Sequence, residues 1–89
     1  MKKFDLGKLF MTKGVAENCH YEDLFECVKK HSVGDWGNLC EEDKQLNDSA
    51  VVDGGRILSA YEIGENKVKI WIITEADRSY TTILLPEEY

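Results

Sequence analysis

The chain has 89 residues, of which 43% are hydrophobic and 31% charged, and its formal net charge at pH 7 is -6. A chain of this length supports one hydrophobic core, so we expect a single domain over residues 1–89. The excess of acids disfavours direct binding to nucleic acid, because no basic surface is evident that could neutralise a phosphate backbone. No segment approaches the roughly 18 consecutive apolar residues that a membrane-spanning helix needs.

The N-terminal third gives a mixed signal followed by a clear one. Residues 9–12 suit a short strand and residues 15–19 suit a turn of helix, and the sequence does not decide between them. Residues 21–31 then place Tyr21, Leu24, Phe25 and Val28 at the spacing of one apolar helical stripe. Acids open this segment and basic residues close it, which suits the helix dipole. We expect a helix whose stripe faces the core.

A second, shorter helix is predicted over residues 41–53. The segment begins with three acids, places Leu46, Ala50 and Val51 on one side, and is followed by two glycines. Glycine is the usual residue where a helix ends in a left-handed conformation. This helix should therefore stop at Gly54.

From Arg56 onward the sequence is typical of β-strands. The segments RILSAYEI, KVKIWIIT and SYTTILLP are rich in β-branched and aromatic residues, and loops of hairpin length separate them. Val68, Ile70 and Ile72 alternate onto one face, which we expect the helices to cover. The predicted fold class is α+β, with N-terminal helices packed on a three- to four-stranded antiparallel β-meander, the fourth strand coming from the N-terminus.

Cysteine usage and the first residues predict a cytoplasmic protein. The three cysteines form no CxxC pair, which favours a reducing compartment, and the apolar residues of MKKFDLGKLF are too interrupted for a signal peptide. The candidate zinc ligands lack the spacing of paired metal knuckles, so we expect no metal and no other cofactor. These candidates are Cys19, His20, Cys27, His31 and Cys40.

The stretch HSVGDWGNLCEED, residues 31–43, holds the most unusual chemistry. His31 closes the first predicted helix, where the helix dipole would favour the imidazolium and raise its pKa. Asp35 and Trp36 lie between glycines, so a sharp turn could either fold the indole into the core or present it outward. Core packing is the prediction for Trp36.

The loop TEADRS, residues 74–79, is a second polar cluster. Arg78 has acidic neighbours, and pairing with Asp77 or Glu75 is the simplest interpretation. Alternatively, alignment of the odd-numbered strand faces would gather a polar patch with aromatic rims on the sheet. Its further members would be Arg56, Ser59, Tyr61 and Thr81.

Three quoted segments carry a family resemblance: HSVGDWGNLCEEDKQLN, GGRILSAYEI and WIITEADRSYTTILLPEEY. Over roughly residues 25–89 they resemble small bacterial, phage and plasmid-associated proteins, often labelled plasmid-related protein or type I restriction endonuclease subunit M. A methyltransferase subunit needs a cofactor fold with a glycine-rich loop, which this chain cannot hold. The resemblance therefore implies a mobile-element setting and not a methyltransferase.

Together these observations predict a small acidic mobile-element protein of the anti-defence type. It would act as a non-catalytic interaction module on a bacterial defence or nucleic-acid-processing complex, with a host or defence protein as partner and no contact with membranes. The sequence does not indicate an oligomeric state. The expected contact surface consists of Asp35, Trp36, Glu41, Glu42, Asp43, Glu75, Asp77 and Arg78.

Two alternatives remain open. The layout is similar to barnase, colicin and RelE-type ribonuclease toxins, which need no metal. That similarity implies His31 as general acid or base, Arg56 or Arg78 as the group that stabilises the phosphate, and Thr81 as a positioning residue. A third hypothesis is a binder of small ligands or nucleotides that stack on Trp36, Tyr61 and Trp71.

Overall fold

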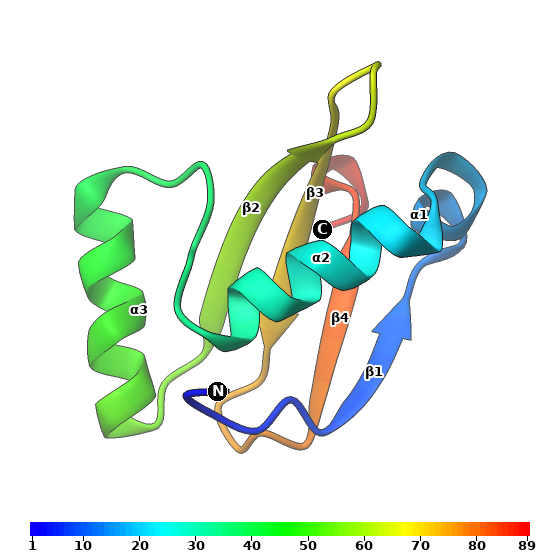
Figure 1. Ribbon diagram of the computed structural model, residues 1–89. Coiled ribbons are helices and arrows are strands. Elements are labelled where there is room, and N and C mark those ends of the chain that lie inside the picture. The colour runs from blue at the N-terminus through cyan, green and yellow to red at the C-terminus, as the bar shows by residue number, and fades with distance from the viewer.

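A computed structural model describes residues 1–89 as an α+β fold (Figure 1). Three helices and a short 3-10 helix accompany one four-stranded sheet. In chain order the elements are β1 Lys8–Met11, α1 Lys13–Asn18, α2 Tyr21–Ser32, α3 Glu41–Asp53, β2 Ile57–Ile63, β3 Val68–Thr74, β4 Tyr80–Leu84 and η1 Pro86–Glu88. None of the helices has the length and hydrophobicity to cross a bilayer.

The sheet has the strand order β1-β4-β3-β2. Strands β2, β3 and β4 form the predicted antiparallel meander. Strand β1 is parallel to β4, with Lys8 opposite Tyr80 and Met11 opposite Ile83, so the prediction of a wholly antiparallel sheet is wrong for its fourth strand. Parallel pairing needs a long connection between the two strands, and here all three helices and two strands of the chain lie between β1 and β4.

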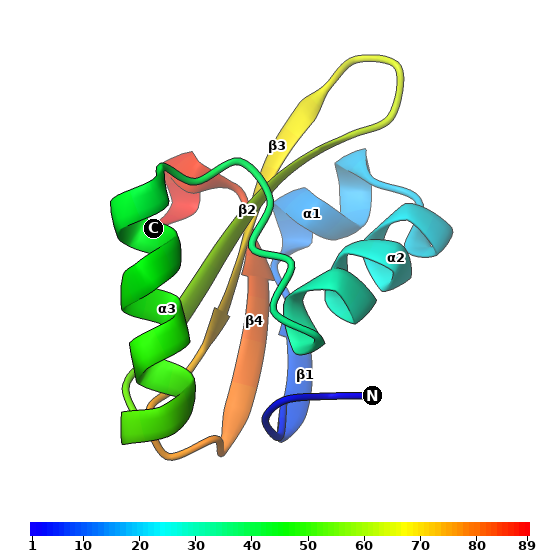
Figure 2. The same cartoon turned by 60° about the vertical axis from the view of Figure 1, so that its left-hand side comes forward.

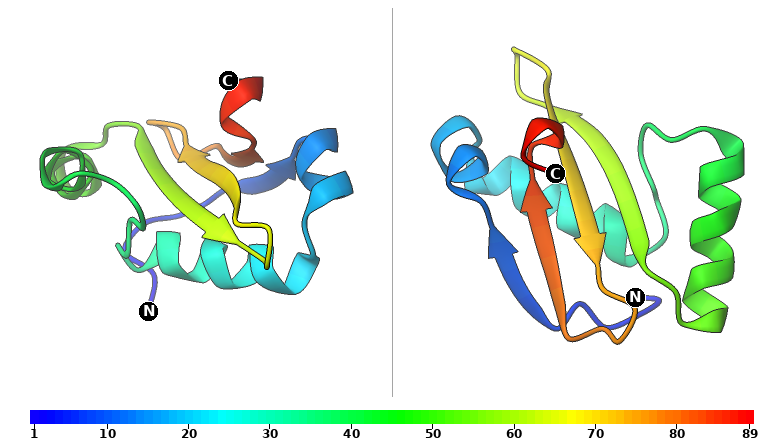
Figure 3. Two further views of the ribbon diagram at one scale, coloured as in Figure 1. Left: turned by 90° about the horizontal axis from the view of Figure 1, so that it is seen from above. Right: turned by 180° about the vertical axis from the view of Figure 1, so that it is seen from behind.

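Helices α1 and α2 lie on one face of the sheet, and η1 lies on the other (Figure 3). Ile70 and Ile72 of β3 are fully buried in a core cluster with Val15 of α1 and Leu24 of α2. This confirms the prediction that helices cover the Val68 face. Each such side chain contributes roughly 1.5–3 kcal/mol when it leaves water, so this layer dominates the stability of the fold.

The buried stripe of α2 differs from the predicted one. Leu24 and Val28 are buried as expected, but the stripe continues through Cys27 and His31. Tyr21 and Phe25, which the sequence placed in the core, are 60% and 53% exposed. Because a helix turns by about 100° per residue, both residues lie on the side of α2 that faces away from Cys27.

The N-terminal segment, for which the sequence allowed either a strand or a helix, forms both. The short strand β1 is followed directly by α1, and Thr12 caps that helix by accepting a hydrogen bond from the N–H of Val15 at 3.3 Å. A threonine at this position satisfies one of the free N–H groups of the first turn. The sequence therefore needs only one residue to pass from strand to helix.

Helix α3 stands beside β2 at the margin of the sheet (Figure 2). It ends as predicted, because Gly54 adopts the left-handed conformation with φ 87° and donates its N–H to the carbonyl of Ala50. Ala50 joins a second, smaller core cluster with Phe4, Trp36 and Ile57. Leu46, which the sequence placed on the same side as Ala50, is 63% exposed.

Candidate functional site around His31

His31 occupies the last turn of α2 and is completely buried against the sheet. Its Nδ1 lies 2.5 Å from Oγ of Ser59 on β2, and its Nε2 lies 2.8 Å from Oγ1 of Thr74 on β3. Both ring nitrogens are therefore engaged by hydroxyl groups from neighbouring strands.

The hydroxyl contacts continue across the sheet and fix the direction of every proton. Thr81 of β4 donates to the carbonyl of Leu6, at 2.7 Å, and its Oγ1 lies 2.8 Å from that of Thr74. A hydroxyl donates only once, so Thr74 donates to Thr81 and accepts from the Nε2–H of His31. The ring proton is therefore on Nε2, and in the neutral imidazole Ser59 donates to Nδ1.

Burial is the main cause that lowers the pKa of His31 to about 4, and the nearby positive charge of Arg78 contributes in the same direction. The sequence predicted the opposite shift, from the position of His31 at the end of a helix. That prediction is wrong because a fully buried imidazolium loses more solvation than the helix dipole returns. The group therefore stays uncharged at neutral pH.

Two aromatic rings close the space around the imidazole. Phe4 meets it edge-on with 5.2 Å between ring centroids, and Trp36 does so at 5.9 Å. The indole is 3% exposed, which confirms core packing for Trp36, and its Nε1–H donates to Asp48 at 2.9 Å. No pattern in the sequence placed Phe4 at this site, because no periodicity marks a single aromatic in an irregular N-terminal segment.

The side chain of Arg78 donates hydrogen bonds to backbone carbonyls. Its guanidinium donates to Gly55 at 2.6 Å, to Ala50 at 2.9 Å and to the main-chain oxygen of Glu75 at 3.1 Å. It also lies over the ring of Phe4, 5.5 Å from the centroid. The predicted ion pair with the Asp77 or Glu75 carboxylate does not form, because the end of α3 offers carbonyls that need a donor.

The residues of the ribonuclease hypothesis are only partly brought together. His31 and Arg78 both contact the ring of Phe4, and Thr81 is linked to His31 through Thr74, whereas Arg56 is exposed and donates to the hydroxyl of Tyr89 at 2.6 Å. Ser59 and Thr81 share one face, as the odd-numbered alignment predicted, but this face lies beneath α2. Each buried side-chain polar atom already has a hydrogen-bond partner. The geometry leaves no open group here for a substrate.

The three aromatic residues of the ligand-binding hypothesis are also engaged within the protein. Trp36 and Tyr61 are buried, and the Tyr61 hydroxyl donates to the main-chain oxygen of Asp35 at 2.7 Å. Trp71 is half-buried, and its ring meets that of Tyr89 with 5.6 Å between centroids. These rings come from separate parts of the fold and do not form one stacking surface.

Five of the six acids of the predicted contact surface are exposed, but they fall into separate groups. Glu41, Glu42 and Asp43 form the first turn of α3, where the helix dipole favours them. Asp77 lies in the loop between β3 and β4, near the other end of α3, about 20 Å away along the helix. There the hydroxyl and N–H of Ser79 lower the pKa of Asp77 by hydrogen bonding. Glu75 and Arg78 are half-buried in that loop.

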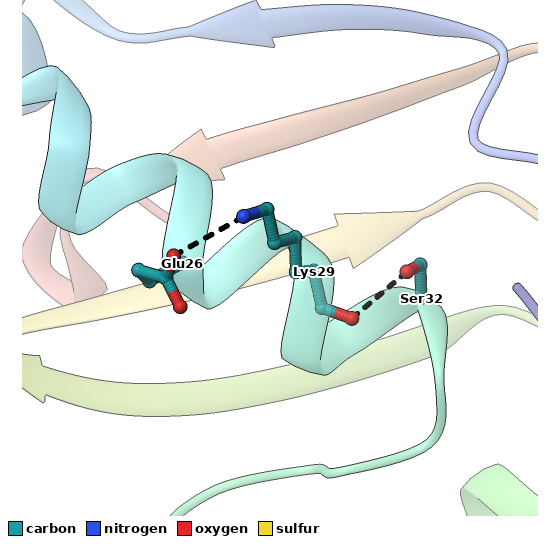
Figure 4. Close-up of polar contacts among 3 residues, drawn as sticks. All are labelled: Glu26, Lys29 and Ser32. Atoms are coloured by element: carbon teal, nitrogen blue, oxygen red, sulfur yellow. Dashed lines mark hydrogen bonds and ion pairs between the residues drawn. The ribbon is translucent and has the colours of Figure 1, made fainter. Parts of the chain in front are cut away.

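Asp35 belongs to a third group that the sequence did not reveal. A surface hollow of about 340 Å³ lies between α2 and β2, and the charged residues of its lining are Asp23, Glu26, Asp35 and Glu62 together with one cation, Lys30. Glu26 forms an exposed ion pair with Lys29 at 3.2 Å on the outer side of α2 (Figure 4). The other three carboxylates have no salt-bridge partner. This hollow can attract a basic group.

The candidate metal ligands do not converge. Cys19, Cys27 and Cys40 are free thiols, and no group of three or more His, Cys, Asp or Glu side chains forms a ligand set. Burial raises the pKa of Cys27 to about 11, so this thiol is protonated at neutral pH.

Comparison with protein-family models, with curated proteins and with solved structures finds no match for the chain. The resemblance to plasmid-associated proteins therefore stays a prediction from the sequence.

Proposed function

We propose that this protein is a non-catalytic interaction module that presents carboxylates to a basic partner protein. The observation that supports this proposal is the partition of its polar groups. His31, Ser59, Thr74 and Thr81 are buried and bonded to one another, so they stabilise the fold. The acids of α3 are exposed, as are those of the α2–β2 hollow except the half-buried Asp23, and most of these acids lack an ion-pair partner.

The partner we propose is a bacterial host or defence protein in the cytoplasm, and the role is of the anti-defence type. The sequence resemblance to mobile-element proteins supports this setting. Proteins that process nucleic acid carry basic surfaces, and an acidic module approaches such surfaces quickly through long-range attraction. The first turn of α3 is the most concentrated acidic segment on the surface, with three consecutive acids. It is the part of the contact surface that we expect to matter most.

Charge reversal tests the proposal. In the variant Glu41→Lys/Glu42→Lys/Asp43→Lys, a partner recovered from lysate of a bacterial host by the wild-type protein should be lost. The matched control Glu17→Lys/Glu65→Lys/Glu87→Lys changes the net charge by the same amount at three exposed positions elsewhere. It should retain the partner.

Folding must be compared for both triple variants, because lysines in the first turn of a helix oppose its dipole by roughly 0.3–1 kcal/mol each. Circular dichroism and urea unfolding provide this comparison. The proposal fails if the wild-type protein recovers no partner, or if the α3 variant and its control bind equally well.

A further inference from the structure

The outer edge of β1 is open. Lys8 and Thr12 direct their N–H groups toward β4, where Ser79 and Ile83 accept them at 3.1 and 3.0 Å. Because strand residues alternate, the N–H and C=O groups of Leu9 and Met11 point away from the sheet. No element lies along this side of β1 (Figures 1 and 3). Two residues therefore present a complete set of unpaired main-chain donors and acceptors.

Apolar side chains flank this edge on both faces of the sheet. Leu9 is 40% exposed on the face that carries the helices. Phe10 is 52% exposed on the opposite face, where its ring meets the 40% exposed Tyr80 with 5.9 Å between centroids. An open edge with apolar residues on both sides is the kind of surface that accepts an additional strand.

The N-terminal segment that contains β1 has a net charge opposite in sign to that of the rest of the chain, although the Glu88 carboxylate accepts a hydrogen bond from Thr12 just after the strand. Residues 1–13 contain four lysines and one aspartate, a net charge of +3, whereas residues 14–89 have a net charge of -9. Lys8 begins β1 and Lys13 begins α1, two residues after the strand ends; both are exposed, and neither forms an ion pair. Asp5, the one acid in this segment, is paired with Lys2 at 3.0 Å.

We propose that β1 receives an extended acidic segment of a partner protein as a fifth strand of the sheet. The main chain of that segment would bond to Leu9 and Met11, its apolar side chains would cover Leu9 and Phe10, and its carboxylates would meet Lys8 and Lys13. A second copy of this chain is disfavoured, because it would bring two lysine-rich edges together. This surface is distinct from the acidic one proposed above and does not depend on it.

A peptide titration tests the proposal on the full chain. The probe is the capped heptapeptide EVTVTVE, followed through amide resonances of the ¹⁵N-labelled protein. We expect saturable shifts centred on Leu9 and Met11. The charge-swapped peptide KVTVTVK should bind about tenfold more weakly or not at all. A peptide with N-methyl groups on the edge-facing amides should lose binding, because it cannot donate to the strand.

Two protein variants separate local charge from general charge. Lys8→Glu/Lys13→Glu should weaken binding of EVTVTVE about tenfold, whereas Lys67→Glu/Lys69→Glu, with the same change of net charge in the β2–β3 region, should leave it nearly unchanged. The proposal is overturned if no saturable shift occurs at millimolar peptide, or if the shifts lie away from β1. It is also overturned if sedimentation shows a dimer that the substitution Phe10→Glu abolishes, since a second copy then occupies the edge.

Discussion

The two edges of the sheet are treated in opposite ways. At the β2 edge, Ala60 donates to the carbonyl of Trp36 at 3.2 Å and accepts from the N–H of Asn38 at 2.7 Å. Two residues earlier in the strand, the side-chain amide of Asn47 bonds to both the N–H and the C=O of Leu58. At the β1 edge no such cover exists. The difference shows that this fold can cover a strand edge, because the chain closes one edge with a loop and a single asparagine.

Each edge depends on a glycine that no other residue can replace without strain. Gly37 has φ +75°, and a Cβ there would lie 2.0 Å from the carbonyl oxygen of Ala60. Gly7, just before β1, has φ +65°, and its Cβ would lie 2.3 Å from the carbonyl oxygen of Ser79. Gly37 therefore allows the backbone to approach β2 closely, and the segment that contains it covers the β2 edge of the sheet.

The largest effect is expected from Gly37→Ala, which would open the closed edge. The variant should lose about 4 kcal/mol of unfolding free energy, because the new Cβ collides with backbone and the φ angle is unfavourable. The amide of Ala60 should exchange its hydrogen faster, since it loses its bond to Trp36. Urea unfolding and hydrogen exchange measure the two effects.

Two further glycine variants isolate the cause. Gly64→Ala has φ +74° but no atom within 4 Å of the new Cβ, so it should cost about 1 kcal/mol from conformation alone. Gly7→Ala should destabilise about as much as Gly37→Ala but leave the Ala60 amide protected. If Gly37→Ala and Gly64→Ala were equally mild, close contact with β2 would not explain the glycine.

The sequence predicted the closed side of the fold better than the open side. Strands β2 to β4 alternate clearly and lie next to each other in the chain, so pattern and loop length were sufficient to order them. The direction of β1 was not predictable, because four mostly exposed residues carry no clear alternation and the partner strand lies about 70 residues away. The edge cover by Trp36 to Asn38 is also non-local, and only the flanking glycines signalled a tight approach.

A second prediction concerns the polar chain that joins the two sides, from Ser59 on β2 through His31 to the Leu6 carbonyl near β1. Because the folded pKa of His31 is about 4 and the ordinary value is 6.5, the unfolded chain takes up a proton first as the pH falls. Stability is thus complete above about pH 6.5 and decreases toward pH 4, by about 3 kcal/mol from this group. Urea unfolding at a series of pH values measures it.

His31→Gln is the matched variant, because an amide can both accept and donate but does not titrate. It should be less stable than the wild-type protein at pH 7, and its unfolding free energy should change much less between pH 6.5 and pH 4. An unchanged pH profile would show that other groups, such as the surface carboxylates, determine the acid sensitivity.

The site itself was predictable only in part. The helical period correctly put Leu24 and Val28 on the buried stripe of α2 but did not place His31 there, and the odd-numbered alignment correctly put Ser59 and Thr81 on one face. The sequence could not show that Thr74 joins them or that Phe4 covers the ring. Both facts depend on tertiary packing, which also decides whether burial or the helix dipole controls the pKa.

A smaller effect than those of Gly37→Ala and of His31 titration is expected from Asn47→Ala, which leaves the N–H and C=O of Leu58 without their side-chain partner. Such a loss at a partly buried site costs about 2 kcal/mol. Asn47→Asp is the control, since a carboxylate can still accept from the Leu58 N–H but cannot donate to its carbonyl. Hydrogen exchange at Leu58 should be fastest in Asn47→Ala and intermediate in Asn47→Asp. If Leu58 stayed fully protected in both, the loop from Trp36 to Asn38 would be sufficient to close the edge, and the contrast with β1 would depend on that loop alone.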